Sequence, residues 1–272
     1  MRVVKTIVHP ETGKVFKLGR RRPVARCPRL KLRNYLYKAL PAPPPGKDYS
    51  PAAAAALSQV YLNDQLGDCV IAGVQHVDGV LTGNAGGPPV IFDDANTKWL
   101  YGKIGGYVDG DDSTDAGCDE QTALSWWQQN GLTADGMHKI AGWAAVDGGN
   151  RDECATALWL FENLIFGVEL PTAWINPMPS ASDFTWDVAG DANPDNGHCF
   201  VGVGYSALGV TIDTWGMLGT ITWAAVAKYA TTAGQGELYT ALGADAISAA
   251  TATAPSGFDL SQLRADLDSI KT

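Results

Sequence analysis

Asn63-Asp-Gln-Leu-Gly-Asp-Cys69 is followed directly by Val70-Ile-Ala-Gly-Val-Gln-His-Val77, so a polar, glycine-containing segment changes abruptly into an apolar one. The apolar positions 70, 74, 77 and 81 share one face of a helix. The pattern predicts a loop that enters a helix at Cys69, with Asp68 as its N-cap. A thiol in the first helical turn faces the positive end of the helix dipole, which favours the thiolate and can make a cysteine reactive.

Two later segments could supply a base for this thiol. Residues 196–205 read as a buried strand with His198 near its start, and residues 209–216 read as the strand that returns after a turn. Pairing of the two strands would bring His198 and Asp213 to the same open end. The carboxylate could then hold the tautomer and orientation of the imidazole. Cys69, His198 and Asp213 are therefore the candidate catalytic residues.

These three blocks, in this order, resemble those of the papain-like cysteine peptidases. In that family a cysteine opens a helix, a Gly-His pair opens a strand rich in Val and Gly, and a Trp-Gly motif follows an Asn or Asp. The blocks here are Gln65-Leu-Gly-Asp-Cys69, Gly197-His198 and Asp213-Thr-Trp-Gly216. Residues 114–131 resemble the family's intermediate helix. Residues 216–239 resemble divergent papain-like proteins encoded by bacteriophages and bacteria.

The resemblance implies a papain-like α+β fold, in which a helical half with the nucleophile helix packs on an antiparallel β half. It also implies roles for individual residues. Cys69 would be the nucleophile, His198 the general base, Asp213 the residue that orients His198, and Trp215 the shield of that pair from water. The implied reaction is hydrolysis of a peptide or related amide bond through an acyl-enzyme on Cys69.

Each of these residues also has a purely structural interpretation. An unpaired cysteine is commonly a buried small hydrophobic residue. His198 could be a hydrogen-bonded core histidine, Asp213 an exposed carboxylate at a strand end, and Trp215 an ordinary core residue. His76 is a poorer base than His198, because seven helical residues would separate it by about 10 Å from Cys69.

The oxyanion site is where the sequence departs from the family pattern. The resemblance implies that the backbone N–H of Cys69 and an upstream amide side chain stabilise the oxyanion. Papain-like enzymes place a glutamine six residues before the cysteine, whereas this chain has Asn63 there and Gln65 four residues before. Both amides stay candidates. The neighbouring Asp68 opposes a reactive thiol, because a carboxylate raises the pKa of an adjacent thiol.

Length and composition limit the remaining possibilities. A chain of 272 residues can bury a sizeable core, and no apolar run reaches the roughly 18 residues of a membrane span. The N-terminus lacks the apolar core and cleavage site of a secretory signal, so cytoplasmic folding is expected. Five cysteines without a C-x-x-C pair argue against a disulfide framework and a zinc ribbon. Cys118 and Cys154 are expected in the core, and no cofactor is expected.

Charge is distributed unevenly along the chain. Residues 1–50 hold thirteen Lys or Arg and two acidic residues, a net charge of +11, whereas the rest of the chain carries −20. This asymmetry predicts a basic arm (1–49) with a small hairpin and a Pro-rich spacer. A papain-like domain (50–247) would follow, and then a linker with a C-terminal amphipathic helix (248–272). We expect the arm to rest on its own acidic body, on neighbouring subunits or on a protein partner.

Two functions are consistent with these features. The first is a papain-like cysteine hydrolase acting on a peptide or amide substrate. The second is a bacteriophage virion protein, capsid-associated, that uses the papain-like body as a scaffold and the basic N-terminal arm as its anchor. The location would be cytoplasmic, or the virion for a phage-encoded protein. Nucleic acid is not an expected partner, because the arm has no recognisable nucleic-acid-binding motif and the acidic body repels phosphate.

Further elements follow from local patterns. The acidic loop 109–120 has the alternating oxygens of a calcium loop, but Thr114 replaces the glycine needed at its sharp turn, so no metal is expected. Helical patterns occupy residues 50–56, 94–104, 119–129, 152–164, 218–229 and 258–270.

Overall fold

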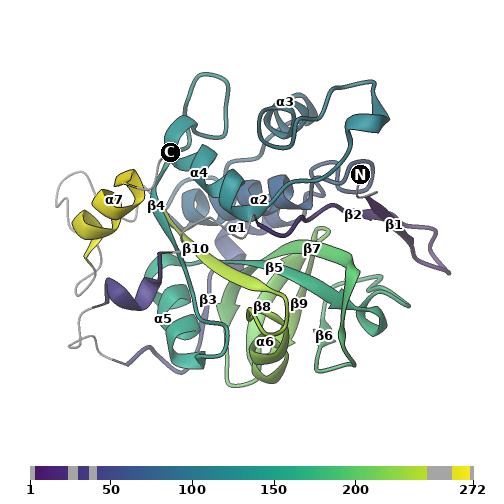
Figure 1. The fold of residues 1–272 in the computed structure, drawn as a ribbon. Coiled ribbons are helices and arrows are strands. Elements are labelled where there is room, and N and C mark those ends of the chain that lie inside the picture. The colour runs from purple at the N-terminus through teal and green to yellow at the C-terminus, as the bar shows by residue number, and fades with distance from the viewer. Residues whose placement is uncertain (1–3, 24–29, 37–41, 244–258, 270–272) are drawn as a thin grey trace.

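The computed structural model describes residues 4–23, 30–36, 42–243 and 259–269. Helices and one large sheet form a mixed α+β fold, as predicted (Figure 1). In this view α2 (Cys69–Asn84), α3 (Asp94–Gly105) and α4 (Glu120–Asn130) lie above the sheet. Cys27, Pro41 (the first residue of the Pro-rich spacer) and the predicted linker at 248–257 lie outside the described residues.

Within the residues that the structure describes, the sheet has eight strands. Its order is β4-β10-β5-β7-β8-β9-β6, and β3 also pairs with β7. All pairs are antiparallel except β6 with β9. The bounds are β3 (Lys47–Asp48), β4 (Ile140–Ala145), β5 (Leu164–Pro171), β6 (Phe184–Trp186), β7 (Ala192–Tyr205), β8 (Gly209–Thr214), β9 (Met217–Thr222) and β10 (Glu237–Gly243).

The remaining elements are short. The other helices are α1 (Ser50–Leu57), α5 (Arg151–Phe161), α6 (Trp223–Tyr229) and α7 (Leu260–Ser269), with the 3₁₀ turns η1 (Leu32–Asn34), η2 (Asp112–Thr114) and η3 (Thr172–Trp174). Helix α7 confirms the predicted amphipathic C-terminal helix. Its Leu263 and Leu267 are buried against Gly142 of β4, where the absence of a side chain leaves room for them.

Helix α2 is held closely against its neighbours by glycines. A Cβ at Gly73 would lie 3.0 Å from the Cys199 sulfur of β7, and a Cβ at Gly79 would lie 2.4 Å from Ala56 of α1. Asp68 occupies the N-cap position, as predicted, but its side chain makes no capping hydrogen bond. The close packing fixes the first turn of α2, and with it Cys69, beside β7.

One predicted helix is wrong in its first half. Residues 217–222 form β9 instead, and only 223–229 are helical. The edge of β8 offers free hydrogen-bonding groups, and Thr220 and Ile221 pair with Thr211 and Val210 there. β-Branched side chains suit that position. Thr222 then caps α6 by accepting a hydrogen bond from the backbone N–H of Ala225.

The N-terminal arm begins with the predicted hairpin, formed by β1 (Lys5–Val8) and β2 (Val15–Leu18).

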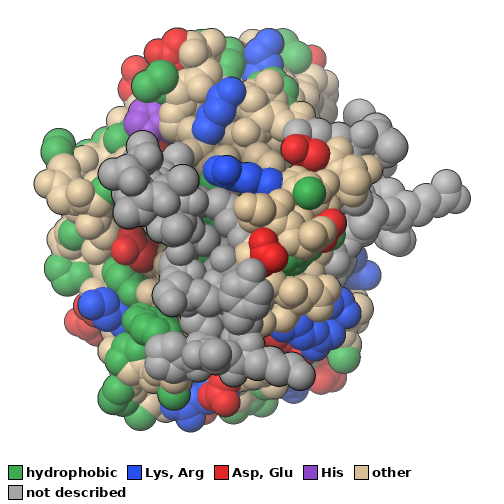
Figure 2. Space-filling model, turned by 90° about the vertical axis from the view of Figure 1, so that its left-hand side faces the viewer, with side chains coloured by type: hydrophobic (Ala, Val, Ile, Leu, Met, Phe, Trp, Pro, Cys, Tyr) green, Lys and Arg blue, Asp and Glu red, His purple; other side chains and the backbone are tan. Residues whose placement is uncertain are grey.

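On the face of the molecule in Figure 2, described basic and acidic side chains are interspersed rather than gathered by sign. None of the helices in the described ranges is long and apolar enough to cross a membrane.

Candidate active site

Cys69 opens α2, as the sequence predicted, and its thiol is almost completely buried, with 1% of the residue exposed. Burial raises the pKa of this thiol to about 12. The backbone N–H groups of Cys199 and Gly19 oppose this rise because they face the sulfur and favour the thiolate. The thiol is therefore protonated at neutral pH in this conformation.

His198 lies in β7, directly before Cys199, and is buried. Its Nε2 lies 2.8 Å from the Thr214 hydroxyl, and its ring stacks on Trp215 at a centroid distance of 4.6 Å. Burial lowers the pKa of His198 to about 3, so the imidazole is neutral. Within the described ranges Nδ1 has no hydrogen-bond partner, and no hydrogen bond joins the ring to the Cys69 thiol. A hydrogen bond donated by Nε2 to Thr214 leaves the Nδ1 lone pair available for a proton.

Asp213 does not contact His198 but faces α2, where its Oδ2 lies 3.3 Å from Nδ1 of His76. Both groups are buried. Burial raises the pKa of Asp213 well above its usual value and lowers that of His76 to about 4. This describes a neutral acid beside a neutral imidazole, rather than an ion pair.

Asp213 lies away from His198 because β7 contains a β-bulge. Near the turn, Tyr205 pairs with Val210, but the register shifts between Gly202 and Gly204, and beyond the shift Val201 pairs with Asp213. Because side chains alternate between the faces of a sheet, a shift of one residue moves Asp213 to the face opposite His198. Thr214, one residue later, occupies the face of His198 instead. The strand pattern predicted the hairpin, but it contained no signal for the bulge.

The two candidate oxyanion amides have different environments. Asn63 is buried, and its Nδ2 donates to the carbonyl oxygens of Lys17 and Leu66 and, at 3.3 Å, to a carboxylate oxygen of Asp68. It is thus engaged in holding the loop before Cys69. Gln65 is exposed. Burial raises the pKa of Asp68, which favours its neutral form.

The arm passes directly over the thiol, a feature that sequence reasoning missed. Gly19 is buried against Gly67, where a Cβ would lie 1.7 Å from the Gly67 carbonyl oxygen. Its own carbonyl oxygen accepts a hydrogen bond from the backbone N–H of Cys118 at 3.2 Å. The basic run after Gly19 was visible in the sequence, but its place in the cleft depends on contacts between distant segments.

The arm also covers the aromatic side of the site. Phe16 in β2 stacks on Trp215 at 5.2 Å, and Trp215 in turn stacks on His198. A cavity of only about 10 Å³ remains where the arm meets Ala116, Asp195 and Gly197. The arm therefore fills the space around Cys69 and His198.

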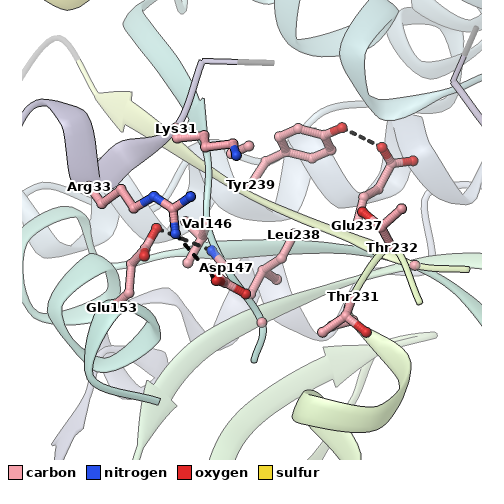
Figure 3. A pocket seen from close by; sticks show the side chains of 14 residues that line it. Lys31, Arg33, Val146, Asp147, Glu153, Thr231, Thr232, Glu237, Leu238 and Tyr239 are labelled. Atoms are coloured by element: carbon pink, nitrogen blue, oxygen red, sulfur yellow. Dashed lines mark hydrogen bonds and ion pairs between the residues drawn. The ribbon is translucent and has the colours of Figure 1, made fainter. Parts of the chain in front are cut away.

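A larger cavity lies elsewhere in the molecule (Figure 3). Its volume is about 220 Å³, and it is bordered by β10 and by the loop that follows β4. Arg33 of the arm points into it toward Asp147, at 3.6 Å, and toward Glu153. Cys69, His198 and Asp213 do not line this cavity.

Oxygens of the acidic loop 109–120 bind other parts of the chain. Asp109 pairs with Lys98, and Asp115 accepts hydrogen bonds from Lys17, Tyr101 and the Gly67 backbone. Within the described ranges, no three His, Cys, Asp or Glu side chains are grouped as a metal site would require.

Solved cysteine proteases share this fold. Xylellain, a cysteine protease from Xylella fastidiosa, matches with a TM-score of 0.59 and 13% identity over 83% of this chain and 96% of xylellain. Digestive procathepsin L 3 from the larval midgut of Tenebrio molitor gives 0.55 and 13% over 81% of this chain and 76% of its own. The ragweed pollen allergen Amb a 11, a cysteine protease in its proform, gives 0.55 and 13% over 80% and 71%.

Comparison of the sequence alone identifies no relative, since neither a protein-family model nor a curated protein matches it. The structural likeness nevertheless confirms the predicted papain-like fold. The resemblance to bacteriophage and bacterial proteins stays a prediction.

Proposed function

We propose that this chain is a cysteine hydrolase that cleaves a peptide or related amide bond through an acyl-enzyme on Cys69. The observation that carries the proposal is the position of Cys69 at the N-terminus of α2 in a papain-like fold, facing the backbone N–H of Cys199 next to His198. His198 supports it, because Nε2 is held by Thr214 while Nδ1 is unpartnered within the described residues.

The reaction would follow from these groups. The Cys69 proton passes to Nδ1 of His198, and the sulfur adds to the carbonyl carbon of the substrate. When the intermediate collapses, the C–N bond breaks and Nδ1 returns the proton to the leaving amine. Water, activated by His198, then adds to the thioester and releases the carboxylic acid and the Cys69 thiol. The backbone N–H of Cys69 and Gln65 or Asn63 are the proposed oxyanion donors.

The conformation with the arm in place is a resting state under this proposal. The thiol and the imidazole are both neutral there, because burial raises one pKa and lowers the other. Displacement of the arm would hydrate both groups and allow the thiolate–imidazolium pair to form. Gly19 and Phe16 are the arm residues that must leave.

The proposal is tested by turnover of a fluorogenic peptide library by protein whose arm has been displaced, as in the Gly19→Ala variant. Cys69→Ala in that background should reduce turnover by at least about 1000-fold, because the nucleophile is removed. Circular dichroism should be unchanged, since alanine fits where the thiol was. Cys154→Ala, a buried cysteine in α5, is the matched control and should keep its activity. Equal turnover by the Cys69 and Cys154 variants would exclude the proposed nucleophile.

A second prediction concerns the residue that orients His198. If Thr214 does so, Thr214→Val should lower kcat by about 10-fold or more and shift the acidic limb of the pH profile, whereas Thr214→Ser should restore both. Asp213→Asn should then have a smaller effect, because Asp213 contacts His76 instead. A larger effect of Asp213→Asn on the pH profile would restore the role that the sequence motif implies.

The virion alternative stays a separate hypothesis. It assigns the arm to neighbouring subunits, whereas Lys17, Arg20 and Arg22 of the arm bind carboxylates of the same chain. No observation within the described residues favours it over the hydrolase.

A further inference from the structure

Three carboxylates are buried along the path of the arm. Glu120 at the start of α4 and Glu169 in β5 are each 0% exposed, and Glu237 in β10 is 4% exposed. Buried charges of one sign are destabilising unless a counter-charge lies beside them. Here the arm supplies the counter-charges through Arg20 and Arg22.

Arg20 occupies a buried guanidinium site. Its Nη2 donates a hydrogen bond to Glu237, and its Nε lies 3.4 Å from each carboxylate oxygen of Glu120. The Tyr239 hydroxyl donates to the other oxygen of Glu237 and so fixes that carboxylate. Gly167 makes room for the Glu120 carboxylate, which would collide with any side chain there. The body is thus shaped around a guanidinium at this position.

Arg22 occupies a second site of different form. Its Nε and Nη2 both donate to Glu169, the second at 2.6 Å, so the planar fork of the guanidinium matches the carboxylate. The side chain of Arg21, between the two, donates to the Ala116 carbonyl oxygen instead of a carboxylate. The two sites therefore bind the side chains of alternate residues, which lie on the same face of an extended strand.

The main chain of the arm is also bound as a strand. The backbone N–H of Arg20 donates to the Gly197 carbonyl oxygen at 3.2 Å, and that of Arg21 donates to the Cys118 carbonyl oxygen at 2.8 Å. These hydrogen bonds do not depend on side chains, so another extended peptide could make them. Selectivity between peptides would therefore come from the two sites that bind the guanidinium groups of Arg20 and Arg22.

We propose that this cleft selects peptides with two arginines separated by one residue, and that the arm occupies it as a mimic of such a substrate. Glu120 and Glu237 hold the first arginine, and Glu169 holds the second. Arginine is preferred over lysine because only the guanidinium offers the fork that Glu169 binds. This inference rests on the proposed function for treating the cleft as a substrate site.

The test measures peptide binding by fluorescence anisotropy, with the full-length Gly19→Ala protein and labelled peptides. The probe is Leu-Gly-Arg-Arg-Arg-Pro, the sequence of residues 18–23. Replacing its first and third arginines by glutamine should weaken binding at least about tenfold, because two charge-assisted contacts are lost. Replacing only the middle arginine is the matched control and should change binding less than about threefold. Glu169→Gln in the protein should abolish the discrimination at the third arginine.

The outcomes separate this inference from the proposed function, because binding does not require turnover. Tight binding of the arginine peptide without cleavage would support the acidic subsites and count against the hydrolase. Equal binding of the arginine and glutamine peptides, or cleavage of both at one rate, would overturn the inference and leave the hydrolase standing. If Gly19→Ala keeps the cleft closed, Arg22→Gln is used instead. It removes the ion pair between the arm and Glu169, and the Arg22 side chain is 47% exposed, so glutamine fits there. Failure of both variants to bind the arginine peptide would also overturn it.

Discussion

Replacing Gly19 by alanine is expected to increase the rate at which iodoacetamide labels Cys69 at pH 7 by at least about 100-fold. A Cβ at this position would lie 1.7 Å from the Gly67 carbonyl oxygen, so the arm cannot seat over the thiol. Burial holds the pKa of the thiol at about 12. A return to the ordinary value of about 8.5 would raise the thiolate fraction at pH 7 about 3000-fold. Mass spectrometry of the labelled peptide identifies the site among the other cysteines.

Controls separate opening of the cleft from a general effect of the substitution. Gly87→Ala places the same methyl group on the surface, at an ordinary contact distance of 4.0 Å from the Thr82 carbonyl oxygen, and should leave labelling as slow as in the unmodified protein. Labelling of the Gly19→Ala protein below pH 7 that slows when His198 is also replaced by alanine would indicate a thiolate–imidazolium pair. Labelling only above about pH 8.5 would indicate an ordinary thiol and count against the hydrolase. A Gly19→Ala protein as unreactive as the control would contradict the covering role of the arm.

Local patterns were sufficient for the elements that build the fold. The change from polar to apolar residues at Cys69 predicted α2, and alternation around His198 predicted the β7–β8 hairpin. These signals are local, because a helix or a strand is recognised from the spacing of apolar residues that are close together in the sequence. Residues 217–222 were misread because the open edge of β8, which they pair with, is a tertiary feature.

The partners of the candidate site residues were less predictable. Which face Asp213 occupies depends on a single bulge between Gly202 and Gly204, and one residue of register exchanges Asp213 for Thr214 beside His198. Helix spacing predicts that His76 is a poorer base than His198, but it contains no signal that His76 contacts Asp213. Charge asymmetry along the chain predicted a basic arm. It could not predict that the arm fills the cleft of its own body.

Arg20→Met is expected to lower the free energy of unfolding strongly. The guanidinium of Arg20, which is 2% exposed, is the counter-charge of Glu120 and Glu237. Methionine fills a similar volume but leaves these carboxylates uncompensated, which should cost about 3–5 kcal/mol at pH 7. For a chain of this size that corresponds to a melting temperature lower by about 10 °C. Arg21→Met removes the same charge from a side chain that donates to a carbonyl oxygen rather than to a buried carboxylate, and should change the melting temperature by less than about 2 °C.

The loss should depend on pH in a direction that identifies its cause. Burial already raises the pKa of Glu120 well above its usual value while Arg20 lowers it, so removing Arg20 raises it further. An acid whose pKa is raised by folding is fully stabilising below its unfolded pKa, and the contribution is lost as pH rises through the folded pKa. Arg20→Met should therefore be least damaging near pH 4.5 and most damaging near pH 8. Urea unfolding across this range measures the trend, and adding Glu120→Gln should reduce both the loss and its pH dependence. A deficit that is the same at every pH would mean that Arg20 stabilises the protein by packing rather than by charge.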